Sequence, residues 1–302
     1  MSVATSNLRQ RKIKDVVFAA LALLLLLFAL LTLLALIVDL ASTGVPRVSW
    51  DFLINFPSRF PEKAGILSAW VGTLCIMLVT ALCAIPLGVA AGIYLEEYAP
   101  KNLVTGFIEL NIVNLAGIPS ITFGLMALGL FVYRFGLGQS IMTAGFTLGL
   151  LVLPIVIVAT REALRTIPSH IREAAYAVGA TKWQVIQHHL VPYSTGGILT
   201  GVIISLSRAI GETAPLITIG AMTFIAFLPT PPVQEAFPFV NAQWLMDPFT
   251  VMPIQMFNWI SRPQHEFHVN AAATGMILLA MTLMMNGIAI YIRGRFRKRI
   301  KW

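Results

Sequence analysis

The stretch that decides the fold of this chain is IREAAYAVGATKWQVIQHHLVP, residues 171–192, a polar interruption between long apolar segments. Within it, Ile171, Ala174, Ala175 and Val178 recur at the spacing of one helix face. Gly179 follows, and glycine permits a sharp turn that residues with a Cβ atom resist. The pattern predicts a helix, a turn and a second helix. Such a unit is either a solvated amphipathic loop or a helical hairpin that fits a groove on a soluble partner.

The surrounding residues 160–192 contain further signals for helix boundaries. The segment TREALRT, residues 160–166, is predicted to form a short helix that ends at Ile167 and Pro168. Ser169 can cap the helix that follows, because a serine side chain accepts a hydrogen bond from a free backbone amide. Gly179 then separates that helix from a third segment.

Composition predicts a membrane protein. Apolar residues make up 57% of the 302 residues and charged residues only 11%, whereas soluble domains contain about 25% charged residues. Apolar runs long enough to cross about 30 Å of hydrocarbon cover residues 16–40, 66–95, 107–132, 141–159, 196–219 and 271–292. We therefore expect an all-α, polytopic integral membrane protein with six transmembrane helices. The two cysteines, Cys75 and Cys83, lie in one run and are interpreted as core thiols.

The distribution of basic residues predicts the orientation in the membrane. Of 21 Lys and Arg residues, 15 lie on the side of the termini, five on the other side, and one, Arg208, inside the fifth run. Because cytoplasmic segments carry an excess of Lys and Arg, both termini and the loop 160–195 are expected in the cytoplasm. Topology thus explains the net charge of +8 without a nucleic-acid partner. The first run exceeds the about 7–15 apolar residues of a signal peptide, so we expect a retained helix.

Two charged residues lie inside the fifth apolar run. If this span begins near Gly196, Arg208 lies about 18 Å along it, close to the middle of the bilayer, where charges normally face a cavity or a partner. Arg208 and Glu212 are four residues apart and are expected to share a helix face, although the base precedes the acid and the pairing should be loose. They are either a structural pair or part of an anion path, because the guanidinium fork suits phosphate oxygens.

The third apolar run contains a second candidate element. Gly117 and Pro119 interrupt its helix, so that Ser120 and Thr122 could line a wet path or hydrogen-bond to a neighbouring helix. A simple helix kink explains the same pattern. Glu109, near the inner end of this run, is expected to snorkel or to form a hydrogen bond with another helix.

Aromatic residues are frequent in the two longer segments expected outside the membrane, residues 41–65 and 221–270. Trp50, Trp244 and Trp259 suit the membrane interface, where aromatic rings settle at the depth of the lipid headgroups. The alternative is that these segments form a docking surface for a partner outside the membrane.

The segment EAAYAVGATKWQVIQHHLVP resembles the signature of the permeases of ABC importers: E-A-A, three residues, Gly, nine residues, Ile, one residue, Leu-Pro. Glu173, Ala174, Ala175, Gly179 and Pro192 match, whereas His189 and Val191 replace the Ile and the Leu. In that family this loop couples the permease to its ATPase, so the resemblance implies that the five matching residues serve ATPase coupling. It also implies the type I ABC importer permease fold, with residues 1–65 as an N-terminal helix and external connection and residues 66–302 as the permease core.

Four further stretches resemble the phosphate-specific members of that family. They are GIYLEEYA (92–99), AGIPSITFGL (116–125), LSRAIGETAPLI (206–217) and, typical of the PstA-type subunit, TVMPIQMFNWISRP (250–263). The resemblance implies a phosphate importer of the bacterial plasma membrane. Its other parts would be a related PstC-type permease, a PstB-type ATPase dimer and an external PstS-type phosphate-binding protein. The substrate path would include Arg208, Glu212, Ser120 and Thr122.

Other classes of function fit the sequence less well. It contains no G-x-x-x-x-G-K-[ST] phosphate loop, so ATP must be hydrolysed by another chain. An intramembrane metalloenzyme would need a pattern such as H-E-x-x-H, but His188 and His189 are adjacent, and we expect no metal, cofactor or enzymatic activity. An ion-driven transporter could use Glu109 or Glu212 for protons but leaves the loop 160–192 unexplained. A permease for another oxyanion remains an alternative.

Overall fold

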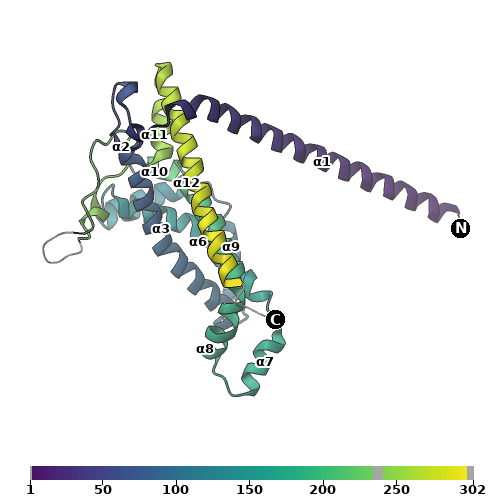
Figure 1. The fold of residues 1–302 in the computed structure, drawn as a ribbon. Helices are drawn as coiled ribbons and strands as arrows, with labels where there is room; N and C mark the ends of the chain where they lie inside the picture. Colours follow the sequence, from purple (N-terminus) through teal and green to yellow (C-terminus); the bar gives the residue numbers. More distant parts are fainter. Residues whose placement is uncertain (1, 234–240, 298–302) are drawn as a thin grey trace.

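The computed structural model describes residues 2–233 and 241–297, which form a bundle of long helices with short helices at both ends (Figure 1). The first elements in chain order are α1 (Ser2–Gly44), η1 (Val45–Arg47), α2 (Trp50–Ile54), η2 (Pro61–Lys63), α3 (Leu67–Ile93), η3 (Tyr94–Tyr98), α4 (Leu103–Leu115), α5 (Ser120–Ala127) and η4 (Leu128–Arg134). The others are α6 (Ile141–Arg165), α7 (Ser169–Ala177), α8 (Lys182–Val185), η5 (Ile186–Leu190), α9 (Val191–Ile210), α10 (Ala214–Thr218), η6 (Gln243–Met246), α11 (Met252–Ile260) and α12 (His265–Arg297). Of the short turns, η3, η4 and η5 are π-helical.

Six segments can cross a membrane by length and composition. Five are continuous helices, and they cover Arg11–Arg47, Leu67–Tyr98, Ile141–Arg165, Lys182–Ile210 and His265–Arg295. The sixth is a broken span in which Leu103–Leu115 and Ser120–Arg134 meet at 106°. The prediction of an all-α, polytopic membrane protein with six spans is confirmed when the broken pair counts as one span.

The fifth span differs from its prediction. Its helix begins at Lys182, not near Gly196, and ends at Ile210, so that residues 214–218 form the separate helix α10. Pro192 does not interrupt this span. It lies in the first turn of α9, and α9 continues directly from the π-helical turn η5. Proline has no amide hydrogen to donate, and a preceding turn that already departs from α-helical geometry accommodates this loss.

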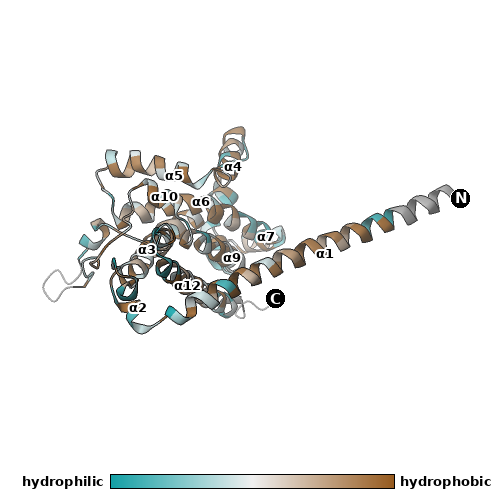
Figure 2. Ribbon diagram, turned by 90° about the horizontal axis from the view of Figure 1, so that it is seen from above, coloured by the Kyte–Doolittle hydropathy of each residue, from teal (hydrophilic) through white to brown (hydrophobic). Residues whose placement is uncertain are grey.

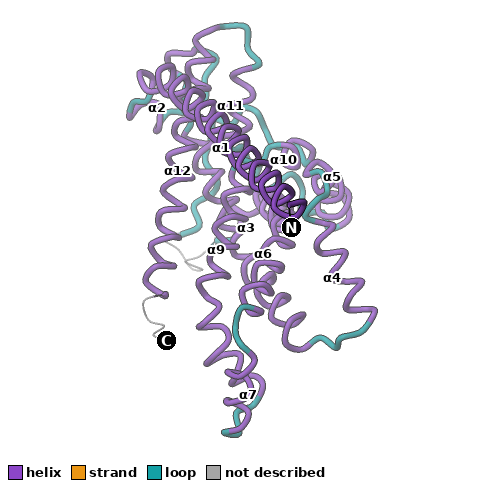
Figure 3. Tube along the Cα trace, turned by 90° about the vertical axis from the view of Figure 1, so that its right-hand side faces the viewer, coloured by secondary structure: helices purple, strands orange, loops and turns teal. Residues whose placement is uncertain are grey.

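Helix α6 packs along both α3 and α9, and the three helices lie side by side in the bundle (Figure 3). Both neighbours approach α6 through pairs of glycines four residues apart. A Cβ atom on Gly88 or Gly92 of α3 would lie 2.7 Å from a side-chain atom of α6, and one on Gly197 of α9 would lie 2.6 Å from the Cβ atom of Ala163. Small residues at this spacing let transmembrane helices pack closely.

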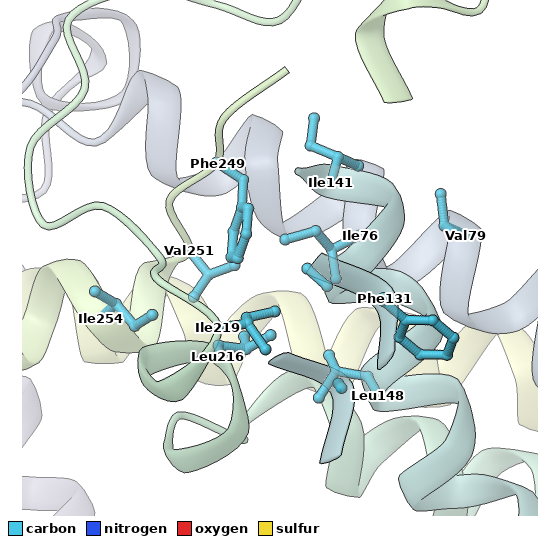
Figure 4. Close-up of a cluster of buried hydrophobic side chains, with 12 residues drawn as sticks. Ile76, Val79, Phe131, Ile141, Leu148, Leu216, Ile219, Phe249, Val251 and Ile254 are labelled. Carbon is cyan, nitrogen blue, oxygen red and sulfur yellow. The ribbon is translucent and has the colours of Figure 1, made fainter. Parts of the chain in front are cut away.

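The largest group of buried apolar side chains lies in the half of the bundle near α11 (Figure 4). It joins Ile76 and Val79 of α3, Phe131 of η4, Ile141 and Leu148 of α6, Leu216 of α10, Ile219, Phe249, Val251 and Ile254 of α11. Because these residues come from five helices and adjoining loop positions that are far apart in the sequence, their burial fixes the broken span and α10 against α3 and α6.

Helix α1 packs against α12 only near its own C-terminal end and extends away from the rest of the molecule (Figure 1). Its side chains from residue 11 to residue 39 are almost all exposed, and the helix is apolar along most of its length (Figure 2). An apolar helix of this kind is stable in lipid or against another membrane helix, since water would not solvate it.

The three tryptophans expected at the membrane interface occupy different surroundings. Trp50 is exposed and Trp244 is half-buried, but Trp259 is fully buried between Phe52 and Phe267, with ring centroids 6.0 and 6.3 Å away. The prediction of an interfacial role is therefore wrong for Trp259. Its indole belongs to the core where α2, α11 and α12 meet, and the sequence does not distinguish a core tryptophan from an interfacial one.

The two ends of the bundle carry different segments, as the predicted topology requires. Helices α2 and α11 lie at one end, and α7 and α8 project from the other, which we call the coupling end (Figures 1 and 3). Helix α12 runs from the α11 end towards the coupling end. Some of the basic residues counted for the orientation, those in 298–301, lie outside the described residues.

Candidate functional site

The segment predicted to couple to a partner forms the outermost part of the coupling end. TREALR is not a short helix of its own but the last turns of α6, and α7 begins at Ser169 after a break at Pro168. The prediction that Ser169 caps α7 is wrong, because Pro168 holds that position and no side chain caps the helix. Thr181 and Gln184 instead form a capping box at the start of α8.

Gly179 makes the turn between α7 and α8, with a φ of +86°. A residue with a Cβ atom rarely adopts this left-handed conformation, so the predicted reason for a glycine at this position is confirmed. The predicted apolar stripe divides in two: Ile171 and Ala175 pack towards Leu164 and Leu190, whereas Ala174 and Val178 face outwards.

The outward surface of this segment is apolar and aromatic. Tyr176, Val178 and Trp183 are 44%, 85% and 59% exposed, and Glu173 and Ala174 lie on the exposed side of α7. Clustered exposed side chains of this kind are typical of a protein interface. Of the five residues predicted to serve coupling, Glu173, Ala174, Gly179 and Pro192 are exposed and Ala175 is buried beneath them.

Arg208 and Glu212 form an ion pair, but they do not share a helix face. Arg208 lies in the last turn of α9, and Glu212 follows the end of that helix. A single contact joins them, with 3.4 Å between Nε and Oε1. The Arg208 side chain is 41% exposed and that of Glu212 is 17% exposed. Arg208 lies within the fifth span, as predicted, but near the end of its helix and not near the middle, because the helix stops at Ile210. One long hydrogen bond holds the guanidinium there.

The predicted interruption of the third span is a sharp bend. Pro119 precedes α5, Thr122 donates a hydrogen bond from Oγ1 to the Pro119 carbonyl over 2.7 Å, and Ser120 begins the helix half-buried. A gentle kink is thereby excluded, since α4 and the helix from Ser120 meet at 106°. The hydroxyl of Thr122 therefore bonds within the first turn of its own helix and not to a neighbouring helix.

These two regions meet in the structure. Phe123, next to Thr122, belongs to the same buried cluster as Ala209 and Ile210, next to Arg208. Helix α10, which follows Glu212, packs on α5 so closely that the backbone of Pro215 lies over Gly124. The four residues predicted for the substrate path therefore lie on two elements that pack against each other, although no direct contact joins Ser120 or Thr122 to Arg208.

Reasoning from the sequence missed a network of charges at the coupling end. The topology prediction counted Arg161 as a residue of the cytoplasmic loop, but it lies in α6 and is only 5% exposed. Its Nη2 lies 2.6 Å from Glu109 Oε1 of α4, and its Nε lies 3.5 Å from Glu96 Oε2 of η3. Arg165 also bonds to Glu96, over 2.9 Å. The expected interhelical role of Glu109 is confirmed as an ion pair. The residues of this network are too far apart in the sequence for any local signal to show it.

An open pocket of about 610 Å³ lies beside the network, between η3, α4 and α6, and Glu109, Arg161 and Arg165 contribute to its wall. Acidic and basic side chains both line this pocket, with Glu96 and Glu109 beside the two arginines. It therefore lacks the excess of positive charge that attracts an anion into a cleft. Within residues 2–233 and 241–297, no three His, Cys, Asp or Glu side chains gather as a metal site would require.

The helical membrane fold and the segment 160–192, which we call the coupling segment, are both typical of one family of transport proteins. The family model described as "Binding-protein-dependent transport system inner membrane component" matches residues 84–300. The chain belongs to this family. It is therefore a membrane subunit of a transport system and not an enzyme.

Two relatives and one solved transporter add to this assignment, and they identify the membrane subunit as a permease. The phosphate transport system permease protein PstA of Xylella fastidiosa strain 9a5c is 29% identical over 290 residues, which cover 95% of each chain. The PstA protein of Mycobacterium leprae is 36% identical over 217 residues, 70% of each chain. A solved inward-facing conformation of the MetNI methionine ABC transporter matches 74% of this permease and 93% of that chain, with a TM-score of 0.58 and 15% identity. At that identity the likeness concerns the fold alone.

Proposed function

We propose that this chain is the PstA-type permease subunit of an ATP-driven phosphate importer in the bacterial plasma membrane. The observation that carries the proposal is the match to a phosphate transport permease over 95% of both chains. The coupling segment supports it, because it projects an exposed, apolar face from one end of the bundle where an ATPase could dock.

The proposal includes three kinds of partner. A related PstC-type permease would complete the path, a PstB-type ATPase dimer would bind α7, and a PstS-type phosphate-binding protein would dock at the α11 end. The excess of Lys and Arg on one side of the predicted spans supports a cytoplasmic location for both termini and for the coupling end. The exposed apolar surface of α1 fits lipid or the second permease.

In this mechanism, closure of the ATPase dimer moves α7, and the movement reaches the spans through α6 and α9. The path then opens alternately to each side of the membrane. Arg208 makes a transient contact with the anion. Among residues 2–233 and 241–297 its guanidinium, which has five N–H donors, makes only the long hydrogen bond to Glu212. Glu212 holds the guanidinium between transport cycles, and Ser120 and Thr122 line the path near the bend.

The substitution Arg208→Gln tests the path. We expect phosphate uptake by cells to fall at least about tenfold, the effect of losing a charge-assisted hydrogen bond. Pull-down of the ATPase with the tagged chain should give the wild-type amount. Arg134→Gln, an exposed arginine in a turn at the other end, serves as the matched control and should keep normal uptake. Normal uptake by Arg208→Gln would make this arginine a structural charge and remove it from the path.

A further inference from the structure

Three successive residues of the π-helical turn η3 contact three successive parts of the coupling end. Glu96 binds Arg165 of α6, with 2.9 Å between Oε2 and Nε. Glu97 binds Arg172 of α7, with 2.8 Å between Oε1 and Nη2. The ring of Tyr98 lies 4.8 Å from the ammonium nitrogen of Lys182, the first residue of α8. The turn after α3 thus contacts α6, α7 and α8, and α7 is the helix that the proposed function assigns to the ATPase.

The contact to α7 is the most buried of the three. The Glu97 side chain is 8% exposed, and the same oxygen also accepts a hydrogen bond from Arg172 Nε over 3.2 Å. Arg172 in turn donates to the carbonyl oxygens of Ile167 and Leu164 at the end of α6, over 2.9 and 3.2 Å. A charge-assisted bond in such a poorly solvated place is strong and little affected by salt. Arg172 therefore fixes α7 to α3 and α6 together.

The π-helical geometry of η3 lets neighbouring side chains reach different elements. The amide of Ala99 donates to the carbonyl of Tyr94, five residues back, over 2.9 Å. This wider turn departs from the α-helical ladder of α3, and such turns occur frequently at functional sites. Ile93, the last residue of α3, also packs against the apolar cluster formed by α6, α7 and α8, so an apolar contact accompanies the polar ones.

We infer that η3 is a second transmission element of the permease, in which Glu97 and Arg172 carry the displacement of α7 directly to α3. The covalent route passes from α7 only into α6 and α9. The contact through η3 adds α3, and the ion pairs of Arg161 with Glu96 and Glu109 extend it to α4. All helices that reach the coupling end from residue 67 to residue 210 then move as one unit. This inference rests on the proposed function.

The test measures phosphate transported per ATP hydrolysed in proteoliposomes that contain the complete complex. With Glu97→Gln, the ATPase should bind and hydrolyse ATP, but the transport ratio should fall about tenfold, as expected when a charge-assisted bond is lost. Arg172→Gln should lower the ratio at least as far, because it also weakens the bonds to the Ile167 and Leu164 carbonyl oxygens. Adding Glu97→Gln to Arg172→Gln should lower the ratio little further, because the same ion pair is already lost. Glu162→Gln, a neighbouring and mostly exposed glutamate paired only with Arg165, is the matched control and should keep the wild-type ratio.

A wild-type ratio for Glu97→Gln overturns the inference and leaves the proposed function intact. Loss of the ATPase from the Glu97→Gln complex would make the pair an assembly contact and contradict the inference. A further fall of the ratio when Glu97→Gln is added to Arg172→Gln would show that the two residues act separately, and it would contradict the inference too. Absence of ATP-driven phosphate transport in the wild-type complex would instead contradict the proposed function.

Discussion

At the scale of single residues, buried ion pairs join the helices at the coupling end of this permease. Arg161 is only 5% exposed, and its guanidinium is balanced by Glu109 and Glu96 from two other elements. A buried ion pair of this kind adds little stability compared with an apolar pair, but removal of one partner leaves an uncompensated charge. The sequence could not reveal this, because a lone arginine at the end of an apolar run looks like an ordinary boundary charge.

Replacement of Arg161 should destabilise the protein. In Arg161→Met the side-chain stem is kept and the charge is lost, and Glu109 remains without its partner. We expect the free energy of unfolding to fall by about 3 kcal/mol, the lower end of the range for a broken buried pair, because Glu109 is partly exposed. Thermal unfolding in detergent measures the change. Arg134→Met should leave the unfolding temperature unchanged, and the double variant with Glu109→Gln should recover part of the loss. Equal unfolding temperatures for Arg161→Met and wild type would refute a stabilising pair.

Gly179 gives a second prediction at this scale. Gly179→Ala places a Cβ atom on a backbone with a φ of +86°, so we expect the free energy of unfolding to fall by about 1 kcal/mol. We also expect weaker binding of the ATPase, because the turn changes shape. Thermal unfolding and pull-down of the ATPase report the two effects. Gly106→Ala is the control, since the added Cβ atom there meets nothing within 4 Å inside α4. It should keep or slightly raise stability, and an equal effect of both substitutions would contradict the role of the turn.

At the scale of elements, the broken third span and α10 form one packed unit. Gly124 of α5 faces Pro215 and Thr218 of α10, and Phe123 packs into the cluster that contains Ala209 and Ile210. The position of the bend therefore depends on the segment that carries Arg208 and Glu212. The sequence predicted the interruption from Gly117 and Pro119, but the 106° angle follows from packing against α10, which no local pattern shows.

The close contact between α5 and α10 can be tested by adding one methyl group. In Gly124→Ala the new Cβ atom would lie 2.6 Å from Pro215 Cα and would overlap Thr218 Oγ1, so the two helices must separate. Overpacking of this kind costs about 1–3 kcal/mol. We expect a lower unfolding temperature together with reduced phosphate uptake. Gly129→Ala in the same half of the span, where a Cβ atom meets nothing within 4 Å, should behave as wild type. The contact is unimportant if the two variants are indistinguishable.

The presence of each membrane-spanning helix was easier to predict from the sequence than the residues at which it begins and ends. The apolar runs and the turn at Gly179 follow from composition and local backbone chemistry, and all are present in the structure. The start of the fifth span was misplaced because the prediction followed the apolar run from residue 196, whereas the helix also includes the more polar residues from Lys182 and continues through the π-helical turn η5. Trp259 was misassigned because burial depends on residues from α2 and α12 that are distant in the sequence.

At the scale of the whole molecule, the two ends of the bundle have different construction. A large apolar cluster fixes the half near α11 (Figure 4). At the coupling end a smaller apolar cluster is joined by ion pairs between η3, α4, α6 and α7. Close apolar packing keeps its geometry, and the charge-assisted bonds join the helices of the coupling end so that they move together. This division suits a permease in which movement enters at one end.

Phosphate uptake into proteoliposomes that contain the complex purified through this chain tests the central claim most directly. ATP and the binding protein are supplied on their respective sides, and a proton gradient without ATP serves as the comparison. We expect radiolabelled phosphate to enter only with ATP and the binding protein, and excess sulfate to leave the rate unchanged. Uptake driven by the proton gradient alone would contradict an ATP-driven importer, and equal competition by sulfate would contradict phosphate as its substrate.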